Sequence, residues 1–94
     1  MIRSYRDKET ERLGAGGKVR QWEAFRVQAE KRLRILDAAT SLGDLAKLNS
    51  NHLETLRGDR AGQYSIRIND QWRICFEWPK HHPGPLHVEI VDYH

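Results

Sequence analysis

Residues 64–78, YSIRINDQWRICFEW, decide the fold of this chain. Apolar side chains occupy every second position on either side of a polar turn at residues 69–71: Tyr64, Ile66, Ile68, Trp72, Ile74, Phe76 and Trp78. A period of two is that of a β-strand with one buried face. The stretch therefore predicts a β-hairpin, which ends at Pro79 because proline cannot donate to a strand ladder.

The sequence on both sides of the hairpin extends this pattern. After a loop over residues 80–85, Leu86, Val88 and Ile90 again occupy alternate positions, which predicts a last strand. Between Lys18 and about Thr40, apolar residues instead recur at intervals of three and four: Val19, Trp22, Phe25, Ala29, Leu33 and Leu36. That spacing predicts one long amphipathic helix, whose aromatic residues we expect in the core rather than as a platform for stacked bases.

Shorter elements precede and follow the long helix. Residues 1–6 predict a short strand, and residues 7–13 predict one or two helical turns that the glycine-rich residues 14–17 stop. Ser41 predicts the N-cap of another short helix, because Asp44 follows three positions later as in a capping box. We therefore expect an α+β fold: an N-terminal strand and helices, then a mostly antiparallel sheet with helices packed on one face and the other face open.

The composition is that of an ordinary globular protein, and 94 residues leave room for a single domain, residues 1–94. The formal net charge is +3, and basic residues are concentrated within residues 18–34. Such a basic helix suits a polyanion, although a solvated helix face explains it as well.

The single cysteine, Cys75, lies in an apolar run, which predicts a reduced and packed thiol. Since neither a signal-like start nor a run of about 20 apolar residues is present, we expect a cytoplasmic protein without a membrane segment.

Arg67 and Arg73 form the first candidate for a functional site. They flank the same tight turn and share the face opposite the apolar row, so we expect them to be cross-strand neighbours. Two guanidinium groups on an open face repel each other unless an anion is expected there, and phosphate matches their forked donors well. The alternative is that each arginine pairs with a nearby carboxylate such as Glu77 or Glu89, and the spacing alone does not choose between the two.

Residues 56–76, LRGDRAGQYSIRINDQWRICF, surround this arginine pair, and the chain ends in VDYH. Together with the opening MIRSY and the segment DAATSL at residues 37–42, they resemble the HigB branch of the RelE-like toxins over nearly the whole chain. The resemblance implies a RelE-like fold and the toxin of a type II toxin–antitoxin system. It implies a ribosome-dependent endoribonuclease that cleaves messenger RNA and inhibits translation and growth, with no metal and no other cofactor.

The implied reaction is attack of an RNA 2′-hydroxyl on the adjacent phosphate, so DNA, which lacks that hydroxyl, should be spared. On the positions that match the family, Arg73 holds the scissile phosphate and Arg57 lies beside it, both as electrostatic stabilisers. Arg67 and Arg60 are further RNA-binding residues in this interpretation.

The final residues supply the proton chemistry that the resemblance implies. His94 is the proton carrier, since an ordinary histidine has a pKa of about 6.5, while Asp92 orients or polarises it and Tyr93 stacks on a base or donates a hydrogen bond. Composition alone would instead favour a frayed chain end. Strict alternation sets Tyr93 on one side of the last strand and Asp92 and His94 on the other, so the strand must bend or stop near Val91 if all three are to reach one site.

Glu54 marks a departure from the family. Some relatives carry a histidine in the pattern LHxLKG, whereas residues 53–58 here read LETLRG. Glu54 could still act as the base, but an ordinary glutamate, with a pKa of about 4.3, is a weak base at neutral pH unless burial or a carboxylate neighbour raises that pKa. We therefore expect a slower or more ribosome-dependent nuclease than the relatives that carry the histidine.

The remaining histidines have no spacing typical of a zinc site and are interpreted as loop or surface residues: His52, His81, His82 and His87.

The resemblance also implies partners. The cognate antitoxin would be a HigA-type helix-turn-helix protein that forms a hetero-oligomer with the toxin, with operator DNA bound through the antitoxin and messenger RNA met on the ribosome. Two other functions remain open: a catalytically weak RNA- or ribosome-binding protein of the same fold, and a protein-interaction subunit in which the arginine face is incidental.

Overall fold

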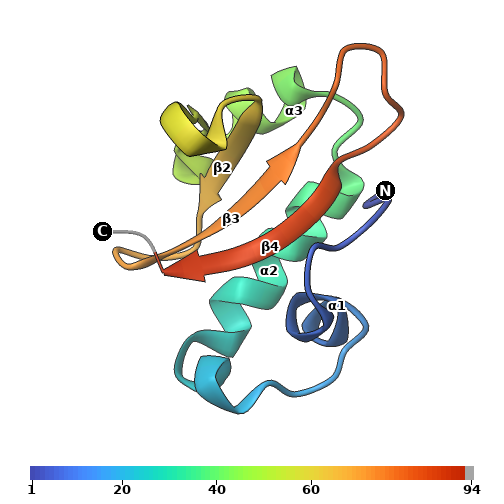
Figure 1. Cartoon of the computed structure of the whole chain (residues 1–94). Coiled ribbons are helices and arrows are strands. Elements are labelled where there is room, and N and C mark those ends of the chain that lie inside the picture. Colours follow the sequence, from blue (N-terminus) through green and yellow to red (C-terminus); the bar gives the residue numbers. More distant parts are fainter. Residues whose placement is uncertain (93–94) are drawn as a thin grey trace.

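The computed structural model describes residues 1–92, and in that range helices gather around one antiparallel sheet (Figure 1). The α-helices are α1 (Lys8–Gly14), α2 (Arg26–Ala38) and α3 (Leu42–Lys47), and the 3₁₀ helices are η1 (Arg20–Phe25), η2 (Asn49–Asn51) and η3 (Gly58–Arg60). The strands are β1 (Glu54–Thr55), β2 (Gln63–Arg67), β3 (Trp72–Glu77) and β4 (Leu86–Asp92). The expected α+β class is confirmed.

The sheet has the order β1-β2-β3-β4, and each neighbouring pair is antiparallel. The predicted hairpin is β2–β3, in which Ile66 pairs with Ile74 and Arg67 with Arg73. Asn69 closes the turn, because its Oδ1 accepts hydrogen bonds from the backbone N–H groups of Gln71 and Trp72, each at 2.8 Å. β1 was not predicted, since a strand of two exposed residues shows no alternation of apolar and polar side chains.

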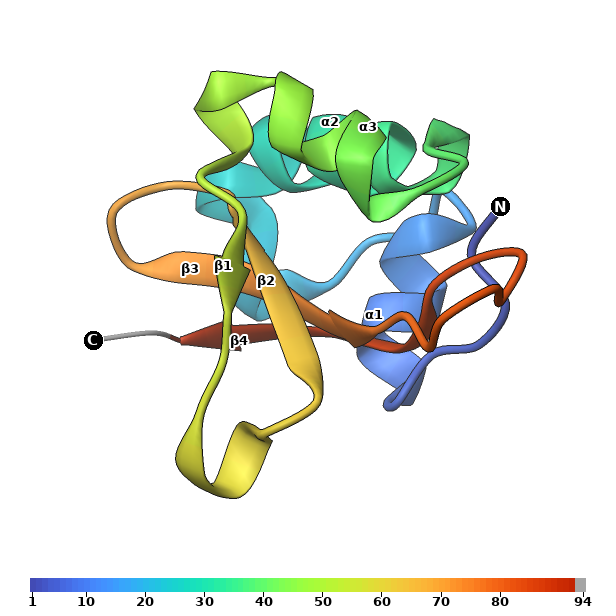
Figure 2. The same ribbon diagram turned by 90° about the horizontal axis from the view of Figure 1, so that it is seen from above.

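One face of the sheet carries the core, and α2 and α3 lie on that side (Figure 2). The Trp72 ring stacks on Phe25 at a centroid distance of 5.0 Å and meets the edge of Trp22 at 6.4 Å. The aromatic residues of the predicted helix are therefore core residues, as expected. The helix itself differs from the prediction, because residues 20–25 form a 3₁₀ helix before α2. In a 3₁₀ helix, side chains three residues apart lie one above the other. Trp22 and Phe25 therefore point the same way, and both contact the Trp72 ring.

The N-terminal segment lies beside β4, but it forms an isolated parallel bridge, Tyr5 with Val88, rather than the predicted strand. Ser4 O accepts a hydrogen bond from Val88 N at 3.1 Å, and Arg6 N donates to Val88 O at 2.9 Å. A shift in the β3–β4 register leaves two residues of β4 opposite Phe76, one of which is His87 with a φ of 53°. This bulge limits regular pairing along the outer edge of β4.

Side chains cap the starts of both short helices, of which only the Ser41 cap was predicted. Asp7 accepts a hydrogen bond from Thr10 N at 3.0 Å at the start of α1, and Ser41 Oγ accepts one from Asp44 N at 3.2 Å at the start of α3. Thr10 also connects α1 to the sheet, since its Oγ1 accepts a hydrogen bond from Ile90 N at 3.1 Å. Within residues 1–92, no helix has both the length and the apolar character that a membrane span requires.

Candidate active site

The face of the sheet turned away from the core carries most of the candidate residues. Direct cross-strand partners share a face, so the register builds one row across all four strands: Glu54, Ser65, Cys75 and Glu89. The neighbouring row, closer to the hairpin turn, consists of Arg67, Arg73 and Val91. The expectation that Arg67 and Arg73 are cross-strand neighbours is confirmed.

Arg73 is held by hydrogen bonds along one edge of its guanidinium group. Nε donates to Ser65 Oγ at 2.8 Å, and Nη2 donates to the His52 carbonyl oxygen at 2.5 Å. The third nitrogen, Nη1, lies 3.6 Å from Glu54 Oε1. The Arg73 side chain is 8% exposed, which corrects the expectation of an arginine on an open face. The guanidinium group is covered because it contacts Ser65 on β2, the His52 carbonyl after η2 and Glu54 on the edge strand β1.

Glu54 is the carboxylate at this site, and its side chain is 47% exposed. It pairs directly with Ser65 in the register of β1 and β2, which explains why it lies next to Arg73. Burial, which the sequence offered as one way to make Glu54 a stronger base, is therefore not present. The arrangement sets an accessible carboxylate beside a fixed cation, a combination that suits proton abstraction next to a bound phosphate.

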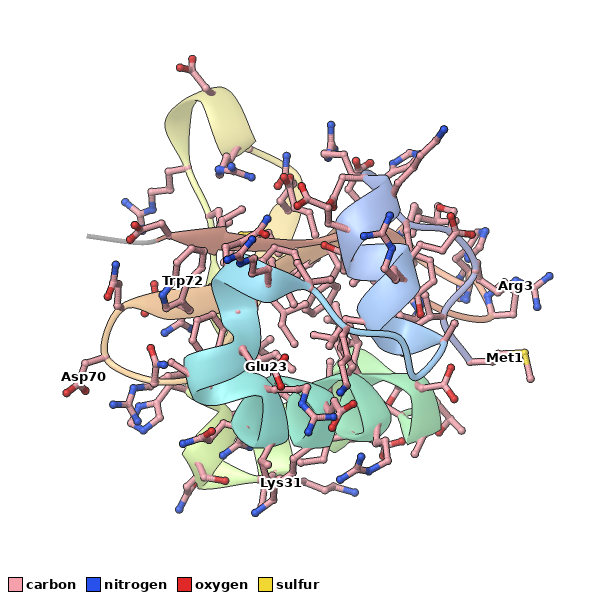
Figure 3. All side chains as sticks on the ribbon, turned by 90° about the horizontal axis from the view of Figure 1, so that it is seen from below. Met1, Arg3, Glu23, Lys31, Asp70 and Trp72 are labelled. Atoms are coloured by element: carbon pink, nitrogen blue, oxygen red, sulfur yellow. The ribbon has the colours of Figure 1, made fainter. Side chains whose placement is uncertain are left out.

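Arg67 is partly exposed and forms an ion pair with Asp70 in the hairpin turn. Asp70 is 99% exposed and projects from the turn, as Figure 3 shows. Both arginines therefore have a carboxylate neighbour, as the alternative interpretation expected. The neighbours are Asp70 for Arg67 and Glu54 for Arg73, rather than Glu77 and Glu89. Burial and then the charge of Arg67 lower the pKa of Arg32, a residue of α2.

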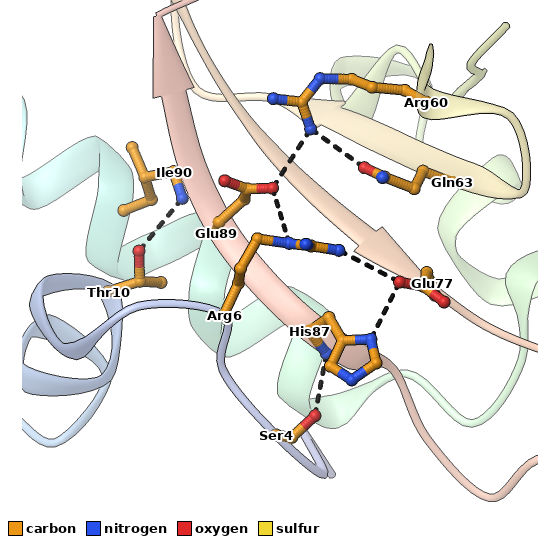
Figure 4. Close-up of polar contacts among 9 residues, drawn as sticks. All are labelled: Ser4, Arg6, Thr10, Arg60, Gln63, Glu77, His87, Glu89 and Ile90. Carbon is orange, nitrogen blue, oxygen red and sulfur yellow. Dashed lines mark hydrogen bonds and ion pairs between the residues drawn. The ribbon is translucent and has the colours of Figure 1, made fainter. Parts of the chain in front are cut away.

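Glu77 and Glu89 belong to a second polar cluster on this face (Figure 4). Glu89 Oε2 lies 3.0 Å from Arg6 Nε and 3.1 Å from Arg60 Nη1, while Glu77 Oε2 lies 3.2 Å from Arg6 Nη2 and 2.8 Å from His87 Nδ1. Arg60, an expected RNA-binding residue, is therefore paired with Glu89. The sequence did not indicate this cluster, because Arg6 is more than 70 positions away from its partners.

Arg57 is exposed and directly precedes η3. In the β1–β2 register the chain reaches Arg57 beyond the Gln63 end of β2, whereas Arg73 pairs with Arg67 at the other end. The backbone therefore does not set Arg57 beside Arg73, contrary to the expectation. The sequence could not show this, because β1 and its register were not predicted.

Asp92 is the last residue of β4 and pairs with Trp72. Its Oδ2 accepts a hydrogen bond from Gln71 Nε2 at 3.1 Å, so Asp92 lies at the hairpin turn. Strand pairing continues through Asp92, and no break separates it from Val91. Because direct partners share a face, Asp92 lies on the Trp72 side of the sheet rather than on the Arg73 side. The expected site residues Tyr93 and His94 lie outside the described residues.

The sequence also singled out Cys75 and the histidines. Cys75 is fully buried, as predicted, and burial raises the pKa of its thiol. His52 and His87 are exposed, in keeping with a surface position, and within residues 1–92 no three His, Cys, Asp or Glu side chains converge as a metal site would require. Sequence reasoning missed two residues that hold Arg73: Ser65, which lies in the quoted motif but received no role, and His52, which contributes its backbone carbonyl.

Comparison with known proteins gives a family match over residues 3–94, to the family described as RelE-like toxin of type II toxin-antitoxin system HigB. The chain is 44% identical over 48 residues to Toxin HigB-1 of Vibrio cholerae, which covers 51% of this chain and 50% of that protein. It is 38% identical over 63 residues to Endoribonuclease HigB of Proteus vulgaris, with 67% and 65% covered. An uncharacterized protein of Haemophilus influenzae is 30% identical over 69 residues, with 73% and 67% covered. The chain thus spans about half to two thirds of the length of these relatives.

Proposed function

Because this chain belongs to the HigB-like family of RelE-like toxins of type II toxin–antitoxin systems, we propose that it is an endoribonuclease that cleaves messenger RNA on the ribosome and so arrests translation and growth. The name of the relative from Proteus vulgaris, Endoribonuclease HigB, supports the activity. The observation that carries the proposal is the fixed guanidinium of Arg73 beside the accessible carboxylate of Glu54.

The reaction is attack of a ribose 2′-oxygen on the adjacent phosphorus. The O2′–P bond forms and the P–O5′ bond breaks, which leaves a 2′,3′-cyclic phosphate on one fragment and a 5′-hydroxyl on the other. Negative charge develops on the non-bridging oxygens, and a preorganised cation is worth most where charge develops. Arg73 supplies this charge through its guanidinium group, whose orientation is fixed by the bonds from Nε to Ser65 and from Nη2 to His52.

Two protons move in this reaction. Glu54 takes the proton from the 2′-hydroxyl, since it is the carboxylate that lies next to Arg73 Nη1. The leaving 5′-oxygen receives a proton from the C-terminal residues, for which His94 is the carrier with Asp92 and Tyr93 as its supports. Asp92 ends β4 at the hairpin turn but on the Trp72 side of the sheet, so the assignment requires that His94 reach the Arg73 side.

The flanking arginines bind the RNA backbone in this proposal. Arg67 is the neighbour of Arg73 across the hairpin, while Arg57 and Arg60 lie at η3, beyond the Gln63 end of β2. We further propose a HigA-type helix-turn-helix antitoxin as partner, a hetero-oligomer that reaches operator DNA through the antitoxin, and a cytoplasmic location. Membership in a toxin–antitoxin family supports the antitoxin, because an unopposed nuclease of this kind would stop growth.

Brief induction of the chain in a bacterium, followed by primer extension on abundant messages, tests the activity. The proposal expects new 5′ ends in the reading frame of translated messages and rapid growth arrest. Arrest without cuts would replace the nuclease by a ribosome-blocking protein, and the absence of arrest would leave only a protein-interaction role. Co-expression of the open reading frame beside the gene should restore growth, and failure to do so would remove the antitoxin from the proposal.

A further inference from the structure

Asn51 is a fully buried polar residue at the end of η2, and its side chain has contacts on both sides. Its Nδ2 donates to the Leu45 carbonyl oxygen at 3.0 Å, which connects η2 to α3. Its Oδ1 accepts a hydrogen bond from Arg32 Nη1 at 2.8 Å, and the same nitrogen lies 3.2 Å from Ser50 Oγ. Arg32 and Asn51 thus join α2, α3 and η2 through a charge-assisted hydrogen bond, which is stronger than a neutral one.

The residue after Asn51 is His52, whose φ of 45° lies in the left-handed region. This conformation is unfavourable for a residue with a side chain and persists only where the surroundings hold it. The His52 carbonyl oxygen accepts the hydrogen bond from Arg73 Nη2. A continuous path therefore leads from Arg32 through the Asn51 amide and the left-handed His52 to the guanidinium of Arg73.

We propose that Arg32 and Asn51 are positioning residues for Arg73, which act by holding the His52 carbonyl where it fixes the Arg73 guanidinium. Neither residue touches the reacting atoms. Asn51 holds the end of η2, His52 orients Nη2, and Ser65 fixes Nε from the other strand. Nη1 is then kept on the Glu54 side. The consequence for cleavage rests on the proposed function, whereas the effect on the Arg73 side chain does not.

The charge distribution supports a positioning role for Arg32. Burial, and then the like charge of Arg67, lower the pKa of the Arg32 guanidinium, so the positive charge of Arg32 is disfavoured where it lies. A partly buried charge of this kind keeps its place when specific bonds hold it, and Arg32 has such bonds to Asn51 and Ser50. A helix arginine present only for solubility would extend into solvent, as Lys31 does in Figure 3.

The test begins with the Arg73 side chain in the absence of RNA. Arg32→Lys keeps the positive charge but is one bond too short to reach both oxygens, and Arg34→Lys is the matched control on an exposed position of α2. Nuclear magnetic resonance of the Arg73 Nε and Nη groups, assigned by their loss in Arg73→Lys, reports rotation about the Cζ–Nη2 bond. Arg32→Lys should speed this rotation on the order of tenfold, the effect of weakening one charged hydrogen bond, and Arg34→Lys should not. Unchanged rotation in Arg32→Lys would overturn the proposal.

Cleavage of ribosome-bound message gives the second readout. Arg32→Lys should lower kcat about tenfold or more with little change in KM, because the charge that attracts RNA is kept while the catalytic group is misplaced. On an Arg73→Lys background the same substitution should cause no further loss, and independent losses that multiply would contradict action through Arg73. Asn51→Ala should likewise speed the rotation of the Arg73 Nη2 group and lower kcat. If this buried substitution prevents folding, the test rests on Arg32→Lys. If the wild-type chain cuts no RNA, the proposed function fails while the resonance measurement still decides the positioning role.

Discussion

A guanidinium group that is only 8% exposed has to satisfy most of its donors inside the protein, because a buried charge without partners is strongly destabilising. Arg73 donates to Ser65 Oγ on β2 and to the His52 carbonyl oxygen after η2, and Glu54 lies beside its third nitrogen. The same two bonds that make the residue tolerable to the fold also fix its orientation. Stability and positioning therefore depend on the same atoms at this residue, and a test has to separate them.

Ser65→Ala separates stability from positioning. The substitution removes the acceptor of Arg73 Nε, so we expect a loss of about 1–3 kcal/mol in the free energy of unfolding and a fall in kcat of about tenfold. Asp7→Ala is the matched control, because loss of the α1 N-cap costs about 1 kcal/mol in an element that takes no part in the bonds to Arg73, so kcat should not change. Urea unfolding and single-turnover cleavage measure the two quantities. Equal kcat values for both variants would show that Ser65 is only structural.

At Glu54, one substitution is expected to raise the rate of cleavage rather than to lower it. Near neutral pH an imidazole is a stronger base than a carboxylate, so Glu54→His should raise the rate of codon cleavage, and Glu54→Gln, which cannot accept the proton, should lower it about 100-fold or more. The rates are measured on ribosome-bound message at pH 7. A rate in Glu54→His that is unchanged or lower would end the account of Glu54 as the base.

At the scale of elements, β4 is an edge strand whose outer N–H groups are satisfied by other segments. Ser4 O accepts from Val88 N, and Thr10 Oγ1 accepts from Ile90 N. These bonds explain why α1 and the N-terminal segment lie beside β4, and they leave less of the edge available for pairing with another chain. The α1–β4 contact therefore stabilises the sheet on which the candidate site is built.

Thr10→Val tests this contact. Valine has nearly the shape of threonine but no hydroxyl, so the buried Ile90 N–H loses its acceptor and the free energy of unfolding should fall by about 1–3 kcal/mol. The same substitution at Thr55, which is exposed in β1, should change it by less than about 0.5 kcal/mol. Thermal and urea unfolding provide the comparison. Equal effects at both positions would mean that the Thr10 hydroxyl does not support β4.

The start of α3 predicts a pH dependence. Hydrogen bonds from Thr40 Oγ1 at 2.7 Å and Thr40 N at 2.9 Å lower the pKa of the Asp44 carboxyl group. A pKa that is lower in the folded state than in the unfolded state adds stability above the ordinary value, and this stability is lost as pH falls through the lowered pKa. Asp44→Asn should therefore unfold at lower urea than the wild type at pH 7, and the difference should disappear in acid. A difference that persists at low pH would exclude the carboxylate as its cause.

At the scale of the whole molecule, the parts that could be predicted from the sequence are those fixed by local periodicity. The alternation in residues 64–78 predicted the hairpin and placed Arg67 opposite Arg73, because the turn fixes the register of two adjoining strands. The contacts of Glu54 with Arg73 and of Arg6 with Glu77 could not be predicted, since they join segments that are distant in sequence. Burial of Arg73 follows from the same long-range packing, and the expected position of Arg57 was wrong for the same reason.

The two faces of the sheet have different roles. One face packs on the helices through Trp72 and its neighbours, and the other holds Arg73, Glu54 and the Arg67 side of the hairpin turn. Because these residues come from three strands, the candidate site exists only when the sheet is intact. The central claim is that Arg73 on this second face stabilises the charge that develops when RNA is cut.

The most direct measurement is the single-turnover rate at which purified Arg73→Ala cleaves ribosome-bound message, with circular dichroism to establish that the variant is folded. The account predicts a folded protein whose rate is lower than that of the wild type by about 100-fold or more, because one preorganised cation at the developing charge is lost. A folded variant that cleaves at the wild-type rate would contradict the account and place the chemistry elsewhere on the molecule.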